Sequence, residues 1–404
     1  MNRESSQGGL NYLRHSGSHG TRWVGRGQGV ARQEETDEGD RARRHERRDL
    51  VKAGSVLRHV PRDCGLHQHP KNQQLTEGIN MKQDMAARSA NRSLTSKAVM
   101  YKGLGGYDVI EFVERTVRTP AAGEVRIEVK AAAVNPIDIL FRDPGFANLT
   151  SNIVPGMDAA GVVESVGPGV SRLHPGQKVI AAVNPARPEG GAQAQHIVVP
   201  AASVVPIPEG VSLAQAPILL MTGLTALNAQ EIAALKKGQI LAVSGGAGLL
   251  AQYAIAAAKR QGIKVIADAK PADAEMVRGY GAYIVVERGS GFAKAIRREL
   301  PNGVDALLDT AVLGEKSFGA IRDGGIYIPV RGWGDNPAER GIKIKPMTVS
   351  SVLERTEWLE LLRNMVASGE IKLRVVEKYA PTKAADAQSA LVAGSPRGRP
   401  VIVF

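Results

Sequence analysis

The chain has 404 residues, a formal net charge of +12 and 43% hydrophobic residues, a composition that suits two or three domains with buried cores. Its single cysteine excludes an intramolecular disulfide and a four-cysteine zinc site, and it indicates a reducing compartment. No stretch approaches the roughly 18 apolar residues of a membrane helix, and the N-terminus lacks a secretory signal, so we expect a cytoplasmic protein with no membrane partner.

Residues 1–95 differ from the rest of the chain. They are rich in Arg, Glu, Gln, Gly and Ser and show no sustained apolar periodicity, so they bury too little apolar surface to offset the entropy cost of ordering. We interpret 1–95 as a disordered or artefactual extension, with the functional chain starting near Met81 or Met85. A Cys-x-x-His-x-His group at 64–69 lacks a fourth ligand, so we expect no metal there.

From residue 96 onward, short apolar runs alternate with turns that contain Gly and Pro. Such a series predicts a compact, barrel-like β domain. Its expected strands are 97–100, 109–113, 125–134, 162–166, 177–183 and 196–199. After Ala214 the pattern changes to strand–helix–strand, which is typical of a parallel sheet. Strands of that sheet are expected at 240–243, 263–267, 283–286, 304–309 and 325–330.

The strongest chemical signal is a glycine-rich turn between the strand at 240–243 and a helical run to Gln261. Its pattern, Gly246-x-Gly248-x-x-Ala251, is an accepted form of the dinucleotide fingerprint. We expect Gly246 to form the tight turn, Gly248 to let the backbone approach a pyrophosphate, and Ala251 to let the helix pack closely on the strand. The N–H groups at the helix start would then bind phosphate.

Residues after the next strand bear on the choice of cofactor. Asp268 follows that strand, and a carboxylate there would accept hydrogen bonds from a ribose 2′-OH and favour NAD(H). Lys270 and Arg288 favour NADP(H), because both could reach a 2′-phosphate. We expect NADP(H), with NAD(H) as a close alternative.

Further blocks follow one another in a characteristic order. They are Lys97-Ala-Val-Met-Tyr-Lys-Gly103, Ala133-Val-Asn-Pro-Ile-Asp138, Val154-Pro-Gly-Met-Asp-Ala-Ala-Gly-Val-Val-Glu-Ser-Val-Gly167, Pro175-Gly-Gln-Lys-Val179, Gly190-Gly-Ala-Gln-Ala-Gln-His196, Val205-Pro-Ile-Pro-Glu-Gly210 and Met221-Thr-Gly-Leu-Thr225. With the glycine-rich turn after them, these blocks resemble the medium-chain dehydrogenase/reductase superfamily, in its zinc-free, quinone oxidoreductase-like branch.

The resemblance implies an α/β fold with two domains. A GroES-like β-barrel domain would be built from 96–215 and 346–404, with a doubly wound parallel-sheet (Rossmann) domain at 216–345 inserted between them. It also implies a small-molecule substrate in the cleft and a homodimer whose contact is the sheet edge near Gly325–Val330. We assign cofactor binding to Thr225, Ser244, Gly245, Gly246, Ala247, Gly248, Leu249, Leu250, Asp268, Lys270, Arg288 and Val330.

The chain departs from the zinc-dependent members of that superfamily. They place a cysteine ligand where this chain has residues 135–138, and residues 96–404 contain no cysteine. We therefore expect no catalytic zinc. His174 and His196 are interpreted as structural or surface residues, and Asp158 in the most characteristic block as structural.

The candidate catalytic residues are Asn135 and Asp138. Asn135 could contact substrate or the nicotinamide ribose, or could only stabilise the turn before its proline. Asp138 could orient Asn135 or Arg142, and a structural salt bridge is the simpler interpretation. Related quinone reductases often carry tyrosines where this chain has Leu140 and Phe146, so no phenolic proton donor is evident.

The expected function is metal-free hydride transfer from NAD(P)H to a quinone or an α,β-unsaturated carbonyl compound. One alternative is an enoyl-thioester reductase of the same fold. Another is a nucleotide-binding protein with little turnover, acting as a redox sensor, a structural protein or an RNA binder. Nucleic acid is not the expected partner, because only 4% of the residues are aromatic and the charges after residue 95 form no long basic stripe.

Overall fold

The computed structural model describes residues 92–144, 152–334, 337–394 and 397–404, all within one compact unit that spans 68–404. Residues 1–91 of the extension expected at 1–95 lie outside these ranges, and so do its Cys/His group and both candidate start methionines. Phe146 also lies outside them. Within the described ranges, no helix has the length and apolar character that crossing a bilayer requires.

The first described element is an antiparallel pair of strands. An isolated bridge between Ala98 and Ala194 ties this pair to the neighbouring sheet. The first strand starts at Leu94, before the domain boundary that the sequence suggests at residue 95. The elements are β1 (Leu94–Tyr101), η1 (Tyr107–Val109) and β2 (Ile110–Val117).

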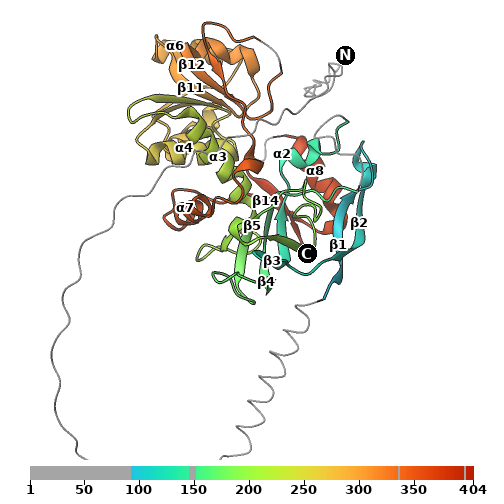
Figure 1. Ribbon diagram of the computed structural model, residues 1–404. Coiled ribbons are helices and arrows are strands. Elements are labelled where there is room, and N and C mark those ends of the chain that lie inside the picture. The colour runs from blue at the N-terminus through green and yellow to red at the C-terminus, as the bar shows by residue number, and fades with distance from the viewer. Residues whose placement is uncertain (1–91, 145–151, 335–336, 395–396) are drawn as a thin grey trace, which may run out of the picture. The chain divides into compact units, whose positions relative to one another are not determined.

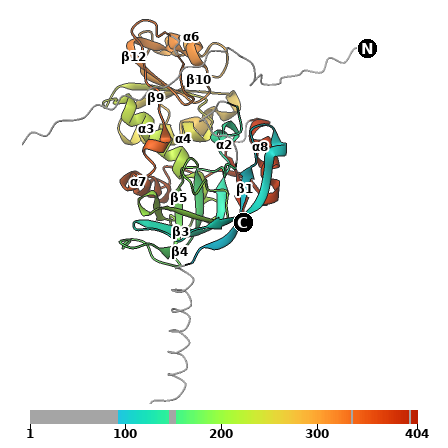
Figure 2. The same cartoon turned by 45° about the vertical axis from the view of Figure 1, so that its right-hand side comes forward.

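A seven-stranded sheet forms the rest of the β domain (Figure 2). Val125, Ile127 and Val129 are buried at alternate positions of its central strand β3, the period of two that a strand imposes. The order is β14–β15–β3–β4–β5–β7, and β6 pairs with the first half of β3. Only β14 and β15 run parallel to each other in this sheet. The strands are β3 (Glu124–Ala133), β4 (Asp158–Val166), β5 (Lys178–Ala182), β6 (His196–Pro200), β7 (Val204–Pro206), β14 (Val375–Tyr379) and β15 (Arg399–Val403).

The second sheet has six strands, all parallel, in the order β10–β9–β8–β11–β12–β13. This is the doubly wound order 3-2-1-4-5-6, in which ligands bind where the order reverses, outside the carboxyl ends of the strands. That point lies between β8 and β11. The strands are β8 (Ile240–Ser244), β9 (Lys264–Ala269), β10 (Ile284–Glu287), β11 (Val304–Asp309), β12 (Ile321–Pro329) and β13 (Lys343–Ile344).

The expected sheet edge at Gly325–Val330 is wrong. β12 is covered on its outer side by β13, through the pairs Ile326–Lys343 and Tyr327–Ile344. The edge of the described sheet is therefore β13, a strand of two residues.

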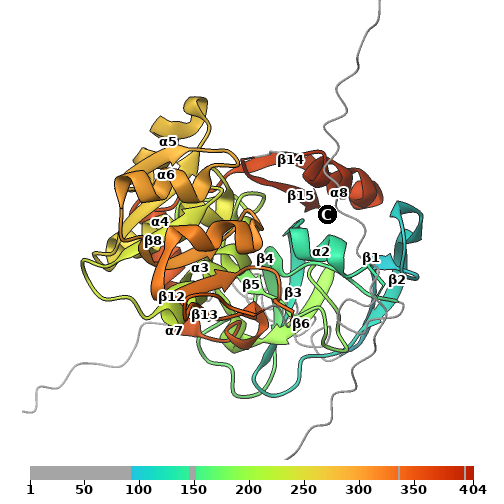
Figure 3. The ribbon, with the colours of Figure 1, turned by 90° about the horizontal axis from the view of Figure 1, so that it is seen from above.

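Helices cover the parallel sheet, and α3 and α4 lie side by side (Figure 1). α3 is buried almost all round. A Cβ at Gly223 of α3 would lie 2.6 Å from the Cδ atoms of Leu362, so glycine allows α7 to approach. Figure 3 shows α8 beside the pair β14–β15. The helices are α2 (Pro136–Leu140), α3 (Leu220–Ala233), α4 (Leu249–Arg260), α5 (Ala274–Gly279), α6 (Phe292–Glu299), α7 (Thr356–Ala367) and α8 (Ala384–Val392), with 3-10 turns η2 (Ala201–Ser203), η3 (Ala216–Ile218), η4 (Pro271–Asp273), η5 (Gly314–Ala320), η6 (Val349–Ser351) and η7 (Pro381–Lys383).

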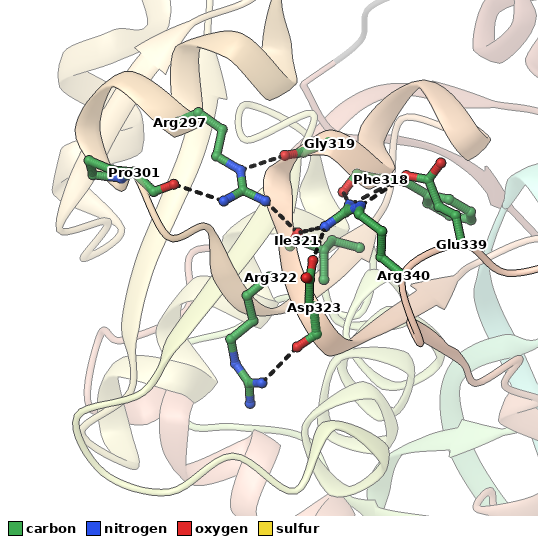
Figure 4. Close-up of polar contacts among 9 residues, drawn as sticks. All are labelled: Arg297, Pro301, Phe318, Gly319, Ile321, Arg322, Asp323, Glu339 and Arg340. Atoms are coloured by element: carbon green, nitrogen blue, oxygen red, sulfur yellow. Dashed lines mark hydrogen bonds and ion pairs between the residues drawn. The ribbon is translucent and has the colours of Figure 1, made fainter.

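Two arginines fix the beginning of β12 (Figure 4). The carbonyl oxygen of Ile321 accepts hydrogen bonds from Arg297, at 2.8 Å, and from Arg340, at 3.0 Å. Arg340 also donates to the carbonyl oxygen of Phe318 and pairs with Asp323. This cluster lies at the amino end of β12, whereas a doubly wound sheet binds its ligand at the carboxyl ends, so we assign it a structural role.

We expect Gly161→Ala to destabilise the β domain. A Cβ at Gly161 in β4 would lie 2.1 Å from the carbonyl oxygen of Glu128 in β3, so the two strands would have to separate. The cost should be about 3 kcal/mol, seen as a lower thermal midpoint by circular dichroism. Gly103→Ala is the matched control, because a Cβ at Gly103 meets nothing within 4 Å. Equal midpoints for the two variants would contradict the close strand contact.

Candidate active site

The glycine-rich turn connects β8 to α4. Gly245 has a φ of +71°, a backbone conformation that favours glycine, and it makes the sharp turn. The expectation that Gly246 forms this turn is therefore wrong. Gly246 is needed for a different reason, because a Cβ there would lie 2.7 Å from the carbonyl oxygen of Asp268.

Asp268 holds this turn in place. Its carboxylate Oδ1 accepts the N–H of Gly245 at 2.5 Å, and its carbonyl oxygen accepts the N–H of Gly246 at 3.0 Å. The side chain is buried inside β9, and burial raises the pKa of the carboxyl group. One carboxylate oxygen is thus used within the chain, whereas the sequence suggested a contact to ribose.

The turn can hold the pyrophosphate of a dinucleotide. Gly248 caps α4 with no side-chain hydrogen bond, and the first-turn N–H groups of a helix have no acceptor within the helix. These groups and the positive end of the helix dipole favour a phosphate. The turn itself is tight, since the N–H of Gly248 donates to the carbonyl oxygen of Gly245 at 2.8 Å.

Ser244 belongs to a buried network at the point where the strand order reverses. Its hydroxyl donates to Asp309 Oδ1 at 2.6 Å and accepts the N–H of Ala311 at 3.0 Å. Asp309 Oδ2 accepts from the Tyr327 hydroxyl at 2.7 Å and from the N–H of Gly314 at 2.8 Å. The Ser244 side chain therefore ties β8 to β11, and its carbonyl oxygen accepts the Thr310 hydroxyl at 2.5 Å.

The other assigned cofactor residues differ in their exposure to solvent. Lys270 and Arg288 are exposed and come together, because they follow neighbouring strands and the N–H of Arg288 donates to the carbonyl oxygen of Ala269 at 2.9 Å. Thr225 and Leu249 are buried, and the Thr225 hydroxyl donates to the carbonyl oxygen of Met221 at 2.7 Å within α3. The remaining members, Ala247, Leu250 and Val330, are partly buried.

Asn135 and Asp138 lie at the start of α2, where Asn135 is the N-cap and the two residues form a capping box. Asp138 Oδ2 accepts the N–H of Asn135 at 2.8 Å and the Gln193 amide at 3.2 Å, and Oδ1 accepts the N–H of Gly156 at 3.0 Å. The alternative in which Asp138 orients Arg142 is wrong. Arg142 Nε donates to Gln388 at 3.0 Å.

Both the nitrogen and the oxygen of the Asn135 side-chain amide form hydrogen bonds. Its Nδ2 donates to Asp158 Oδ2 at 2.9 Å, and its Oδ1 accepts from Arg399 Nε at 3.2 Å. Asp158 Oδ1 accepts the N–H of Met221, the second residue of α3, at 2.6 Å. The four residues join the β domain to the first turn of a helix that covers the parallel sheet.

The two buried acids of this network have pKa values near neutral pH. Burial raises the pKa of Asp138 and of Asp158 to about 7, although hydrogen bonds from backbone N–H groups oppose the shift. Burial lowers the pKa of Arg399 to about 10. The two carboxylates share one nearby guanidinium, so the cluster can take up or release a proton around pH 7.

Sequence reasoning missed Gln193 and three arginines near the end of the chain. Arg399 reaches Asn135, Arg397 pairs with Asp273 at 2.5 Å, and Arg374 donates to the carbonyl oxygen of Ala247 in the glycine-rich turn. No motif could have found the three arginines, because each is more than 100 residues from its partner in the sequence. Gln193 lies within the block 190–196, but nothing in that block shows that its side chain reaches Asp138.

The described histidines stand apart from this cluster. His174 is exposed, and His196 lies within hydrogen-bonding distance of Ser96, at 3.1 Å. Among the described residues, no group of three or more His, Cys, Asp or Glu is arranged to hold a metal ion.

Comparisons with known proteins agree with this geometry. A family model described as the alcohol dehydrogenase GroES-like domain matches residues 121–209. A protein named 2-methylene-furan-3-one reductase, from Solanum lycopersicum, is 30% identical over 319 residues, which are 76% of this chain and 78% of the relative. A protein named NADPH-dependent alkenal/one oxidoreductase, chloroplastic, from Arabidopsis thaliana, is 30% identical over 322 residues, 76% and 79% of the two chains.

A solved structure is similar over the same region. The quinone oxidoreductase from Pseudomonas syringae pv. tomato DC3000 is 25% identical, covers 76% of this chain and 100% of its own, and has a TM-score of 0.68. Together with the two sheets, these likenesses confirm the expected fold class, a GroES-like β domain with a doubly wound parallel-sheet domain.

We expect the contribution of Asp158 to the stability of the protein to fall as the pH rises from about 4 to about 7. The raised pKa of Asp158, about 7, means that in this window the folded chain keeps a proton that the unfolded chain has released. Each such group contributes at most about 1.4 kcal/mol per pH unit. Asp158→Asn cannot titrate, so its thermal midpoint should fall less over this window than that of the wild type.

The matched control is Asp386→Asn, which removes an exposed carboxylate on α8. Its midpoint should follow the wild-type pH dependence. A pH dependence of Asp158→Asn as steep as that of the wild type would refute the proposed titration.

Proposed function

The chain belongs to the medium-chain dehydrogenase/reductase superfamily, in its quinone oxidoreductase-like branch, and on this premise we propose that it transfers hydride from NADPH to a quinone or an α,β-unsaturated carbonyl compound. The observation that carries the proposal is the glycine-rich turn at the start of α4. Asp268 holds this turn in place, and no side chain caps the helix, so its N–H groups can bind a dinucleotide pyrophosphate. The two plant relatives are named as reductases of compounds with a conjugated carbonyl group, which supports this substrate class.

NADPH, when bound, would supply the hydride, and solvent would supply the proton that completes the reduction. The protein binds and orients. Gly245 and Gly248 shape the turn that receives the phosphates, and Asp268 keeps it rigid. Holding both reactants in one geometry and excluding water are the contributions that such a reaction needs most.

Asn135 and Asp138 act as positioning residues in this proposal. Both are fully buried, and both form hydrogen bonds inside the chain. Asn135 accepts a hydrogen bond from Nε of Arg399, whose partly buried guanidinium bears the positive charge of the cluster. A fixed positive charge favours the negative charge that develops on a carbonyl oxygen when hydride adds to a conjugated system.

The preference for NADPH rests on the carboxyl ends of β9 and β10. The acid that would repel a 2′-phosphate, Asp268, is buried and bonded to Gly245. The cations Lys270 and Arg288 are exposed just beyond these strands, beside the exposed Glu287 that ends β10. The Arabidopsis relative is named as NADPH-dependent.

We propose further that the reaction needs no metal, since the chain has no cysteine after residue 64 to serve as a zinc ligand. The domain division at 96–215, 216–345 and 346–404 is supported by the strands, because β13 completes the parallel sheet and β14 joins the other sheet. A homodimer through the outer edge of β13 and a cytoplasmic location complete the proposal.

The test is to follow oxidation of NADPH and NADH by the full chain with a panel of quinones, enones and an enoyl thioester. We expect NADPH oxidation with quinones or enones at a rate above that with the thioester. Nucleotide binding without oxidation of either cofactor would reject the reductase function and favour a sensor or structural role. Turnover of the thioester alone would favour the enoyl-thioester alternative.

The double variant Lys270→Gln/Arg288→Gln tests the cofactor preference. We expect its KM for NADPH to rise about tenfold, the effect of losing hydrogen bonds from charged donors, while its KM for NADH changes little. Arg278→Gln, an exposed arginine of α5, is the matched control. Equal changes in the KM values for NADPH and NADH would show that the two cations do not bind the 2′-phosphate.

A further inference from the structure

Arg374 lies against the glycine-rich turn although it comes from the other domain. It immediately precedes β14, and both Nη1 and Nη2 donate to the carbonyl oxygen of Ala247 at 3.3 Å. Its guanidinium carbon is 5.4 Å from the centre of the Tyr280 ring, which lies just after α5. The side chain therefore spans from the seven-stranded sheet to the turn that begins α4.

The hydrogen-bonding capacity of Arg374 is poorly satisfied. Two N–H groups share one neutral carbonyl oxygen at a long distance, and the buried Nε has no hydrogen-bond partner among the described residues. A guanidinium pairs best with an anion that accepts two N–H groups at once. Burial also lowers the pKa of Arg374, which shows that its surroundings do not stabilise the charge fully.

Of the two neighbouring arginines in the described ranges, Arg397 differs in this respect, whereas Arg399 bonds only to neutral oxygens. Arg397 forms an ion pair with Asp273 at 2.5 Å. Arg399 donates to Asn135 at 3.2 Å. Within the described ranges Arg374 forms no ion pair, and it lies at a turn whose amides and helix dipole favour an anion.

The backbone of Arg374 is bonded directly to the backbone of Arg399, which contacts Asn135 through its side chain. Its carbonyl oxygen accepts the N–H of Arg399 at 3.0 Å, and the next residue, Val375, pairs with Arg399 in the register of β14 and β15. A ligand that moves Arg374 is thus one hydrogen bond away from the strand that carries the guanidinium of Arg399.

We propose that Arg374 is a cofactor-binding residue whose guanidinium pairs with the pyrophosphate of the dinucleotide. Its bonds to Ala247 are exchanged for bonds to phosphate oxygens, and the strand pair β14–β15 is thereby held against the cofactor. The proposal rests on the function proposed above, because it requires a dinucleotide at this turn. The pyrophosphate is common to both nicotinamide cofactors, so Arg374 serves NADPH and NADH alike.

The test is the dissociation constant of the full chain for NADPH and for NADH, measured by isothermal titration calorimetry without a second substrate. We expect Arg374→Gln to weaken both cofactors by the same factor, about 10- to 100-fold. Arg374→Lys, which keeps the charge and loses the planar fork, should fall between that variant and the wild type. Lys372→Gln is the matched control, because it removes one exposed positive charge from the same segment and should bind as the wild type does.

The other outcomes overturn the proposal in distinguishable ways. Binding of both cofactors within twofold of the wild type would show that Arg374 has no contact with the pyrophosphate. Weakening of NADPH alone would place it at the 2′-phosphate. If Arg374→Gln fails to fold by circular dichroism, the ratio of the affinities for ADP and for AMP is compared between Arg374→Lys and the wild type. An unchanged ratio would reject the proposal, and a smaller preference for ADP would support it. A wild-type chain that binds neither cofactor would reject the proposed function itself.

Discussion

The buried carboxylate of Asp158 is the contact on which the arrangement of the site depends. A buried carboxylate is costly unless hydrogen bonds satisfy it, and this one accepts from Asn135 with one oxygen and from the N–H of Met221 with the other. Met221 lies in the first turn of α3, where N–H groups have no partner within the helix. One acid therefore satisfies a helix end of the parallel-sheet domain and fixes the amide that meets Arg399 in the β domain.

Much of the fold could be predicted because it follows from periodicity. The alternation of β3 and the apolar strand before the glycine-rich turn are local signals, and each was sufficient to place its element. The role of Gly246 was wrong because three glycines occur within four residues, and the spacing does not show which of them takes the positive φ. The position of Asp268 was predictable, whereas the inward direction of its carboxylate depends on packing.

The parts of the site that escaped prediction are those made by residues distant in sequence. In the sequence, three of them look like ordinary surface charges: Arg374, Arg397 and Arg399. Only the parallel pairing of β14 with β15 brings their backbone segments together. The edge of the parallel sheet was missed because β13 has two residues, too few for any periodic signal. The burial of Asn135 and the two contacts of its side-chain amide also depend on tertiary structure, because Asp158 and Arg399 are distant in the sequence.

The pairing of β15 with β3 has a consequence for how the chain folds. Val401 of β15 lies opposite Ala133 of the central strand β3. The whole parallel-sheet domain therefore lies between these two paired strands in the sequence. Closing so long a loop from a flexible chain carries a large entropy cost and slows folding. The inserted domain contacts the segment that follows it, since the Asn228 amide on α3 donates to the carbonyl oxygen of Thr348 at 3.4 Å. Once that domain has folded, it holds this segment beside α3, so a shorter loop remains to be closed before β15 pairs with β3.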